Sequence, residues 1–288
     1  MHISKLLTCA CLGVMLSGLG CGSPWPAPPR QATASPAVQE VQCQTLAEGL
    51  TDQVVVLLVD RSDSHLQADA EHLERVRTDA RALVAHLSPA TAVFGYYISA
   101  QSYRGEEAFV RGTVPPVPQR VPCQVTNIFD PRQKRACQQQ THREVEQQAC
   151  VTAARERLSA VLRDLSPEIA RRTDVQGGLL VASEVFQAYP TSHKLMVVYS
   201  DCEDTVHRAY GLGSGHPKKP QGKATPRPQP PALPGFAGVT VIVRPPRTVT
   251  AVQHVPAFQK RLTSWGATVT VQPFEVPWQD VLRQGQHS

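Results

Sequence analysis

Continuous apolar runs rich in β-branched residues constrain the fold of this chain more than any other feature. They occupy residues 53–59, 91–98, 194–200 and 238–243. Runs of this kind are typical of strands that are buried on both faces of a parallel sheet. Because parallel neighbours cannot be joined by a tight turn, we expect a crossover helix between them.

Helical periodicity fills most of the segments between these runs. Apolar residues that recur at intervals of three and four predict amphipathic helices. The predicted helices span residues 66–87, about 144–165, about 175–188 and about 254–264. Two more strands are expected, a short antiparallel partner at 106–111 and a last strand at 267–271. This alternation predicts an α/β three-layer sandwich whose central sheet is mostly parallel, with one antiparallel edge strand.

Two insertions interrupt the alternation. Residues 112–143 contain four prolines between 115 and 122, followed by Cys123 and Cys137. We interpret them as a disulfide-held insertion at the end of the sheet where the parallel strands begin. Residues 211–236 are rich in Gly, Pro, Lys and Gln and leave from the loop after the third buried strand. They either extend a binding surface there or form a solvated loop.

The first 21 residues resemble an export signal. Lys5 precedes an apolar run at 6–19, which is too short to span a bilayer as a permanent helix. The run ends at Cys21 in a sequence that resembles a bacterial lipobox, whose cysteine is lipidated; the alternative is an ordinary secretory signal. We expect an exported protein, lipid-anchored to the bacterial cell envelope, or secreted if Cys21 is not lipidated.

The same reasoning sets the expected domain boundaries. A Pro/Ala-rich tether at 22–45 follows the signal at 1–21, the folded domain spans 46–275 with the two insertions, and 276–288 form a C-terminal tail. The net charge is +5, but no basic helix carries interleaved aromatic residues. We therefore expect no nucleic-acid partner, and membrane contact through the lipid only.

Cysteine usage agrees with export. Of the 8 cysteines, five remain if Cys9 and Cys11 leave with the signal and Cys21 is lipidated. In an oxidising compartment some of these should pair, and an odd number leaves at least one free or bonded elsewhere. The pairing stays open, although a bridge is expected among Cys123, Cys137 and Cys150. The five are Cys43, Cys123, Cys137, Cys150 and Cys202.

Hydroxyl and carboxylate residues follow the first buried run. The segment from Asp60 to Ser64 has the form DxSxS, which alone is as typical of a helix N-cap as of a ligand site. The expected topology strengthens it, because the carboxyl ends of parallel strands share one edge of the sheet. Five side chains converge there: Asp60, Ser62, Ser64, Thr173 and Asp201. All are hard oxygen donors, which suit Mg²⁺, Mn²⁺ or Ca²⁺.

These residues resemble the von Willebrand factor A family with its metal-ion-dependent adhesion site. That family has DxSxS, then a threonine, then an aspartate after a hydrophobic strand. Residues 173–179 and 197–204 resemble the two later segments, with Cys202 where glycine is usual, and the resemblance spans about residues 50–272. It implies that the five side chains hold one Mg²⁺ ion, or Mn²⁺ or Ca²⁺, whose open coordination position accepts a carboxylate of a protein or peptide partner.

The resemblance implies a binding module for adhesion or assembly at the envelope, and not an enzyme. Two alternatives stay open: an Mg²⁺-dependent phosphohydrolase of the haloacid dehalogenase type, although Ser62 stands where that motif needs a second aspartate, and a metal-free structural scaffold. Asp174 and Asp204 are candidates for a supporting shell around the metal. Their favoured roles are at a helix N-terminus for Asp174 and in the following turn for Asp204. Cys202 is expected to be a small buried residue behind the site or a disulfide partner.

Overall fold

The computed structural model describes residues 51–61, 71–100, 102, 108–117, 123, 130–166, 170, 172–191, 193–204, 233–246 and 253–285. The chain divides into two compact units, Met1–Glu40 and Val41–Ser288, and every described residue belongs to the second. The predicted signal, Cys21 and the tether lie outside the described residues, as do residues 211–232 of the second insertion. In the described part of the chain, every helix is too short or too polar to cross a bilayer.

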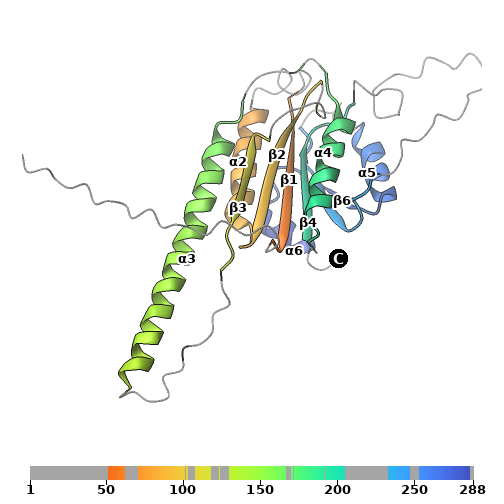
Figure 1. The fold of residues 1–288 in the computed structure, drawn as a ribbon. Coiled ribbons are helices and arrows are strands. Elements are labelled where there is room, and N and C mark those ends of the chain that lie inside the picture. Colours follow the sequence, from red (N-terminus) through yellow and green to blue (C-terminus); the bar gives the residue numbers. More distant parts are fainter. Residues whose placement is uncertain are drawn as a thin grey trace, which may run out of the picture. The chain divides into compact units, whose positions relative to one another are not determined.

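A six-stranded sheet with the order β3-β2-β1-β4-β5-β6 forms the centre of this unit (Figure 1). Its strands are β1 Gln53–Asp60, β2 Thr91–Ile98, β3 Val110–Val114, β4 His193–Tyr199, β5 Val239–Val243 and β6 Thr268–Val271. β1 pairs in parallel with β2 and β4, and β5 pairs in parallel with β4 and β6. β3 runs antiparallel to β2 at the edge. The predicted mostly parallel sheet with one antiparallel edge strand is confirmed.

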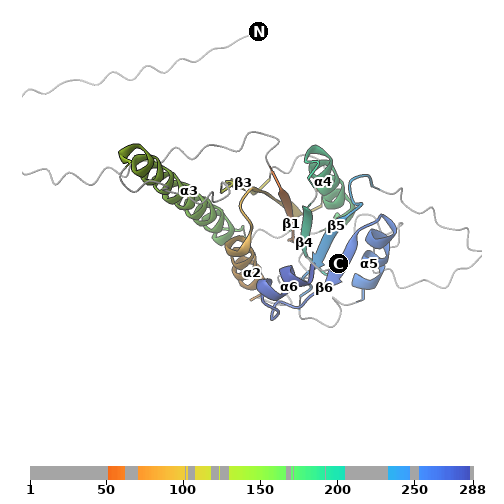
Figure 2. The same cartoon turned by 90° about the horizontal axis from the view of Figure 1, so that it is seen from below.

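Helices cover both faces of the sheet, as Figure 2 shows from below. They are α2 His72–His86, α3 Pro131–Arg163, α4 Val175–Ala188, α5 Val255–Ser264 and α6 Trp278–Gly285. Val54, Val56 and Leu58 of β1 belong to the core that includes α4 and α5. The residues between them face the core that includes α2, α3 and α6. Every position of β1 after Gln53 is therefore buried, which explains its continuous apolar run.

The helix α3 differs from the predicted one. It begins at Pro131 instead of about 144, and the Asp130 side chain caps it by accepting from the backbone N–H of Arg132 at 2.8 Å. No residue of 131–149 is buried, so this half shows no apolar stripe for periodicity to detect. About two fifths of the predicted insertion is thus helix, and the antiparallel edge strand lies at 110–114 instead of 106–111.

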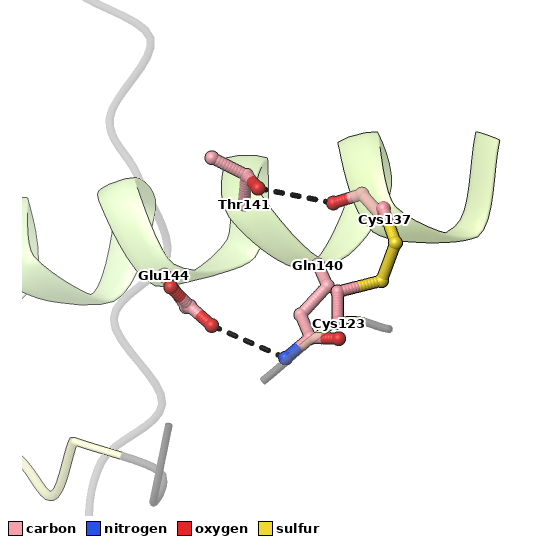
Figure 3. The surroundings of a disulfide bond; sticks show 5 residues. All are labelled: Cys123, Cys137, Gln140, Thr141 and Glu144. Carbon is pink, nitrogen blue, oxygen red and sulfur yellow. Dashed lines mark hydrogen bonds between the residues drawn. A yellow bond between two sulfur atoms is a disulfide. The ribbon is translucent and has the colours of Figure 1, made fainter. Parts of the chain in front are cut away.

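Disulfides stabilise this region. Cys123 pairs with Cys137 on α3, with 5.6 Å between the two Cα atoms (Figure 3). Cys150, the first buried residue of α3, is also disulfide-bonded, and its partner lies outside the described residues. The helix α3 therefore carries two disulfide-bonded cysteines, Cys137 and Cys150.

The C-terminal residues also differ from the prediction. In place of a tail, residues 278–285 form α6, and Trp278 and Val281 are 2% and 5% exposed within the core. An eight-residue helix is too short for periodicity to reveal. The Trp278 indole N–H donates to the backbone oxygen of Asp79 at 2.9 Å, which joins α6 to α2.

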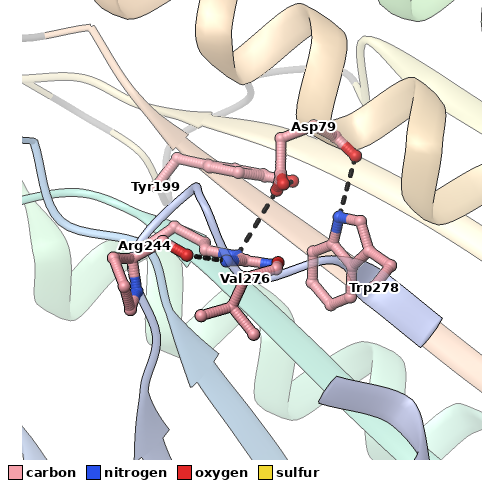
Figure 4. Close-up of polar contacts among 6 residues, drawn as sticks. Asp79, Tyr199, Arg244, Val276 and Trp278 are labelled. Carbon is pink, nitrogen blue, oxygen red and sulfur yellow. Dashed lines mark hydrogen bonds and ion pairs between the residues drawn. The ribbon is translucent and has the colours of Figure 1, made fainter. Parts of the chain in front are cut away.

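A buried polar cluster holds α2, β4, β5 and α6 together (Figure 4). Arg244, fully buried after β5, has its Nε 3.5 Å from Asp79 Oδ2 and donates to the backbone oxygen of Val276 at 3.1 Å. Its guanidinium lies 4.5 Å from the centroid of the Trp278 ring. The Tyr199 hydroxyl donates to Asp79 Oδ2 at 2.9 Å. Burial raises the pKa of Asp79 to about 6, although Arg244 and Tyr199 both lower it.

Candidate metal centre

Two aspartates lie side by side where β1 and β4 end. Asp60 is the last residue of β1, and the register places Val59 opposite Tyr199, so Asp60 lies beside Ser200 and Asp201 follows directly. Because parallel strands end at the same edge of a sheet, the two aspartates follow neighbouring strand ends. Asp60 is 2% exposed and Asp201 is 8% exposed.

Ser200 joins the two strand ends and was not predicted as a site residue. Its hydroxyl donates to Asp60 Oδ2 at 2.7 Å and accepts from the backbone N–H of Cys202 at 2.8 Å. Asp201 Oδ1 accepts from the N–H of Glu203 at 2.8 Å, which fixes the other carboxylate in its turn. The only sequence signal for Ser200 is its place between a buried strand and a candidate ligand.

The Thr173 loop reaches the same edge of the sheet. The backbone N–H of Asp174 donates to the oxygen of Ser99, just after β2, at 2.8 Å. Beside it, the N–H of Arg61 donates to the oxygen of Ile98 at 3.2 Å. Thr173 is therefore held next to the ends of β1 and β2, and it is 2% exposed.

Asp174 and Asp204 both serve the N-terminus of α4. Asp174 Oδ1 accepts from the N–H of Gly177 at 2.6 Å, and Asp204 Oδ2 accepts from the N–H of Gln176 at 3.1 Å. A Cβ on Gly177 would lie 2.2 Å from Asp174 Oδ2, so glycine lets the carboxylate approach. The favoured role of Asp174 at a helix N-terminus is confirmed. Asp204 is fully buried, and its expected role in the following turn concerns residues that lie outside the described ones.

Cys202 occupies the position where the resembled family has glycine. Its φ of +62° is left-handed, a region that favours glycine, and the Ser200 hydroxyl bonded to its N–H supports the turn. Burial, followed by the charges of Asp201 and Asp60, raises the pKa of its thiol well above the ordinary value. A fully buried thiol is a soft donor and does not suit a hard cation that prefers oxygen ligands. It is buried and free, so a disulfide role is excluded.

The described donors at this edge fit a hard cation. The structure places Asp60, Thr173 and Asp201 at the same edge of the sheet, while Ser62 and Ser64 lie outside the described residues. Within the described ranges, no three His, Cys, Asp or Glu residues form a metal-holding group. An ion here would thus depend on two carboxylates and on hydroxyls, a donor set that suits Mg²⁺, Mn²⁺ or Ca²⁺. The Arg61 guanidinium stacks on Tyr97, 4.3 Å from the ring centroid.

Comparison with known proteins gives likeness in structure alone. No family model matches the sequence, and no curated protein matches it. A von Willebrand factor type A protein from Catenulispora acidiphila is 11% identical, with 82% of this chain and 42% of that chain covered and a TM-score of 0.43. The PilB minor pilin from Streptococcus sanguinis is 12% identical, with 82% of this chain and 61% of that chain covered and a TM-score of 0.46.

The third similar structure is of a protein that holds a zinc ion. Proximal thread matrix protein 1 from the mussel byssus, with a zinc-occupied MIDAS motif, is 13% identical, with 77% of this chain and 44% of that chain covered and a TM-score of 0.38. This chain thus spans less than half of two of these three proteins. At such TM-scores the likenesses carry no argument, and the fold class follows from the strand order and register described above.

Proposed function

We propose that this protein is an envelope-anchored binding module that docks a carboxylate of a protein or peptide partner onto a divalent cation. Asp60, Ser62, Ser64, Thr173 and Asp201 would hold the ion, with Mg²⁺ as the first candidate and Mn²⁺ or Ca²⁺ as the others. The observation that carries the proposal is the hydrogen bond of 2.7 Å from the Ser200 hydroxyl to Asp60 Oδ2, because Ser200 directly precedes Asp201.

The chemistry of such a site favours binding over reaction. Only two carboxylates would surround the divalent ion and the hydroxyls add no charge, so the site does not repel an incoming anionic group. Mg²⁺ keeps several waters, so an incoming Asp or Glu can replace one of them. The bound ion supplies the positive charge that the partner's carboxylate pairs with. The residues of this chain orient the ion, and none of them is proposed to act as a nucleophile or base.

We also propose that Cys21 carries the lipid that keeps the protein at the envelope. The disulfide of Cys123 with Cys137 supports export, because such bonds persist in oxidising compartments. Mass spectrometry of the exported protein tests this. A mature N-terminus at Cys21 with added acyl mass is expected, and cleavage elsewhere without that mass contradicts it.

Isothermal titration with Mg²⁺ tests the metal site. Asp60→Ala and Asp201→Ala should each weaken Mg²⁺ binding at least about 10-fold, because each removes a charged ligand. Asp52→Ala is the matched control, since Asp52 is exposed at the opposite edge of the sheet. Equal affinity in all three variants and the wild type would sink the metal site. Partner recovery from envelope extract that EDTA leaves unchanged would instead favour the metal-free scaffold.

A further inference from the structure

The first half of α3 forms an arm that projects from the folded unit. Residues 131–149, the α3 arm, contain no buried residue, and Cys150 is the first. At 1.5 Å per residue the arm is about 28 Å long. Figure 1 shows it extending past the edge of the sheet where the parallel strands begin, away from the candidate metal centre.

The direction of the arm is fixed by contacts further along α3. The Arg155 guanidinium donates to the backbone oxygen of Leu87, which directly follows α2. The same edge holds Asp52, whose N–H donates to the oxygen of Ala90 just before β2 at 2.9 Å. β1 therefore begins at the edge from which the arm projects.

The end of the arm is cationic. Arg132, Lys134 and Arg135, here named the basic tip, are all exposed, and the first turn of α3 contains no acidic residue. Asp130 is the only carboxylate there, and it is engaged in capping. Cations at a helix N-terminus oppose the helix dipole, so the basic tip costs helix stability. The acidic residues of the arm lie further along, where Glu144 accepts from Gln140 and Glu146 pairs with His142.

The arrangement of the basic tip fits a flat anionic surface met end-on. At 100° per residue, Arg132, Lys134 and Arg135 fall within an arc of about 160° in the first five residues of α3, so they lie together at the end of the arm. A planar layer of negative headgroups that meets the arm end-on can contact all three cations at once. The Cys123–Cys137 disulfide, about one turn beyond the tip, ties the arm to the preceding segment and stiffens it.

We propose that the basic tip rests on an anionic phospholipid surface and acts as a spacer that turns the candidate metal centre away from the membrane. The inference rests on the lipid proposed at Cys21, which would keep the folded unit close to a membrane. Contact through the tip is electrostatic, without insertion, and each Lys or Arg near an anionic surface strengthens binding about fivefold.

Vesicle partitioning of the full chain tests the proposal. All proteins carry Cys21→Ser, so the outcome does not depend on lipidation or on the metal site. Each is mixed with vesicles of equal parts phosphatidylglycerol and phosphatidylcholine, and separately with pure phosphatidylcholine vesicles. The ratio of the two partition coefficients cancels any hydrophobic binding by the N-terminal segment, which all the proteins share.

The test variant is R132Q/K134Q/R135Q, and the matched control R81Q/R157Q/K260Q removes three exposed cations elsewhere. The ratio should fall about 100-fold in the test variant and stay near the wild-type value in the control. It should also approach one at 1 M salt, where the Debye length is about 3 Å. Thermal melts check that both variants fold; the salt response of the wild type stands independently of them.

Equal ratios for the two triple variants would overturn the proposal, as would a wild-type ratio near one at low salt. Tighter binding of the wild type to soluble polyglutamate than to the anionic vesicles would assign the basic tip to an acidic protein and overturn the membrane assignment.

Discussion

Replacing Ser200 by alanine removes a hydroxyl that makes two buried hydrogen bonds at the carboxyl edge of the sheet. One bond goes to the Asp60 carboxylate at 2.7 Å and one comes from the Cys202 N–H at 2.8 Å. A hydrogen bond to a charged group contributes about 1.5–3 kcal/mol, and a buried N–H left without its partner costs about 1–3 kcal/mol. Because such terms do not add fully, we expect the free energy of unfolding to fall by about 2–4 kcal/mol.

Urea unfolding at pH 7 measures this loss. With a slope of about 2 kcal/mol per molar urea, the midpoint should fall by about 1–2 M. Ser264→Ala is the matched control, because the Ser264 hydroxyl is exposed and donates only to the Arg261 backbone oxygen one turn earlier. Its effect should stay within about 0.5 kcal/mol.

Repeating the unfolding with saturating Mg²⁺ separates positioning from stability. A bound ion stabilises the wild type by about 2.7 kcal/mol at a concentration 100 times its Kd. Ser200→Ala should gain less, because Asp60 has lost the contact that holds its carboxylate in place. An unchanged Mg²⁺ increment would show that Ser200 does not position the ligand. A loss of stability no larger than that of Ser264→Ala would refute the reasoning about the buried bonds.

Two further predictions concern buried groups. The raised pKa of Asp79, about 6, means that its contribution to stability is present below the unfolded value of 3.8 and is lost as pH rises through about 6. Between pH 4 and 7 the free energy of unfolding, measured in urea, should therefore fall by up to about 3 kcal/mol. The fall should disappear in Asp79→Asn and remain in the exposed control Asp280→Asn. Equal pH profiles for the two variants would contradict this prediction. A maleimide should label Cys202 only after unfolding, because its thiol is fully buried and protonated, and peptide mapping that finds rapid labelling in the folded protein would disprove that burial.

The core of the fold could be predicted because its pattern is local and continuous. β1 lies between two parallel neighbours and under helices on both faces, so every residue from Val54 to Val59 must be apolar. The same topology predicted that the residues after β1 and β4 share an edge, and the structure places Asp60 and Asp201 there. These predictions needed only periodicity and the rule that parallel strands end together.

Elements that show no pattern in the sequence escaped prediction. The α3 arm lacks an apolar stripe because no described core residue covers it, and α6 is too short to show a period. The bond from the Gln176 N–H to Asp204 joins residues that are far apart in the chain, and no pattern in the sequence predicts it. Such a contact depends on which helix end packs beside the loop.

The sequence by itself determined the alternating architecture and the edge at which the oxygen-bearing residues meet, because apolar spacing reports burial directly. Only the tertiary structure decided that Ser200 bridges Asp60, that Cys202 adopts a left-handed turn and that Arg244 is buried against Asp79. These features arise from contacts between residues distant in the chain, and whether a polar side chain is solvated or bonded is settled by its neighbours in space.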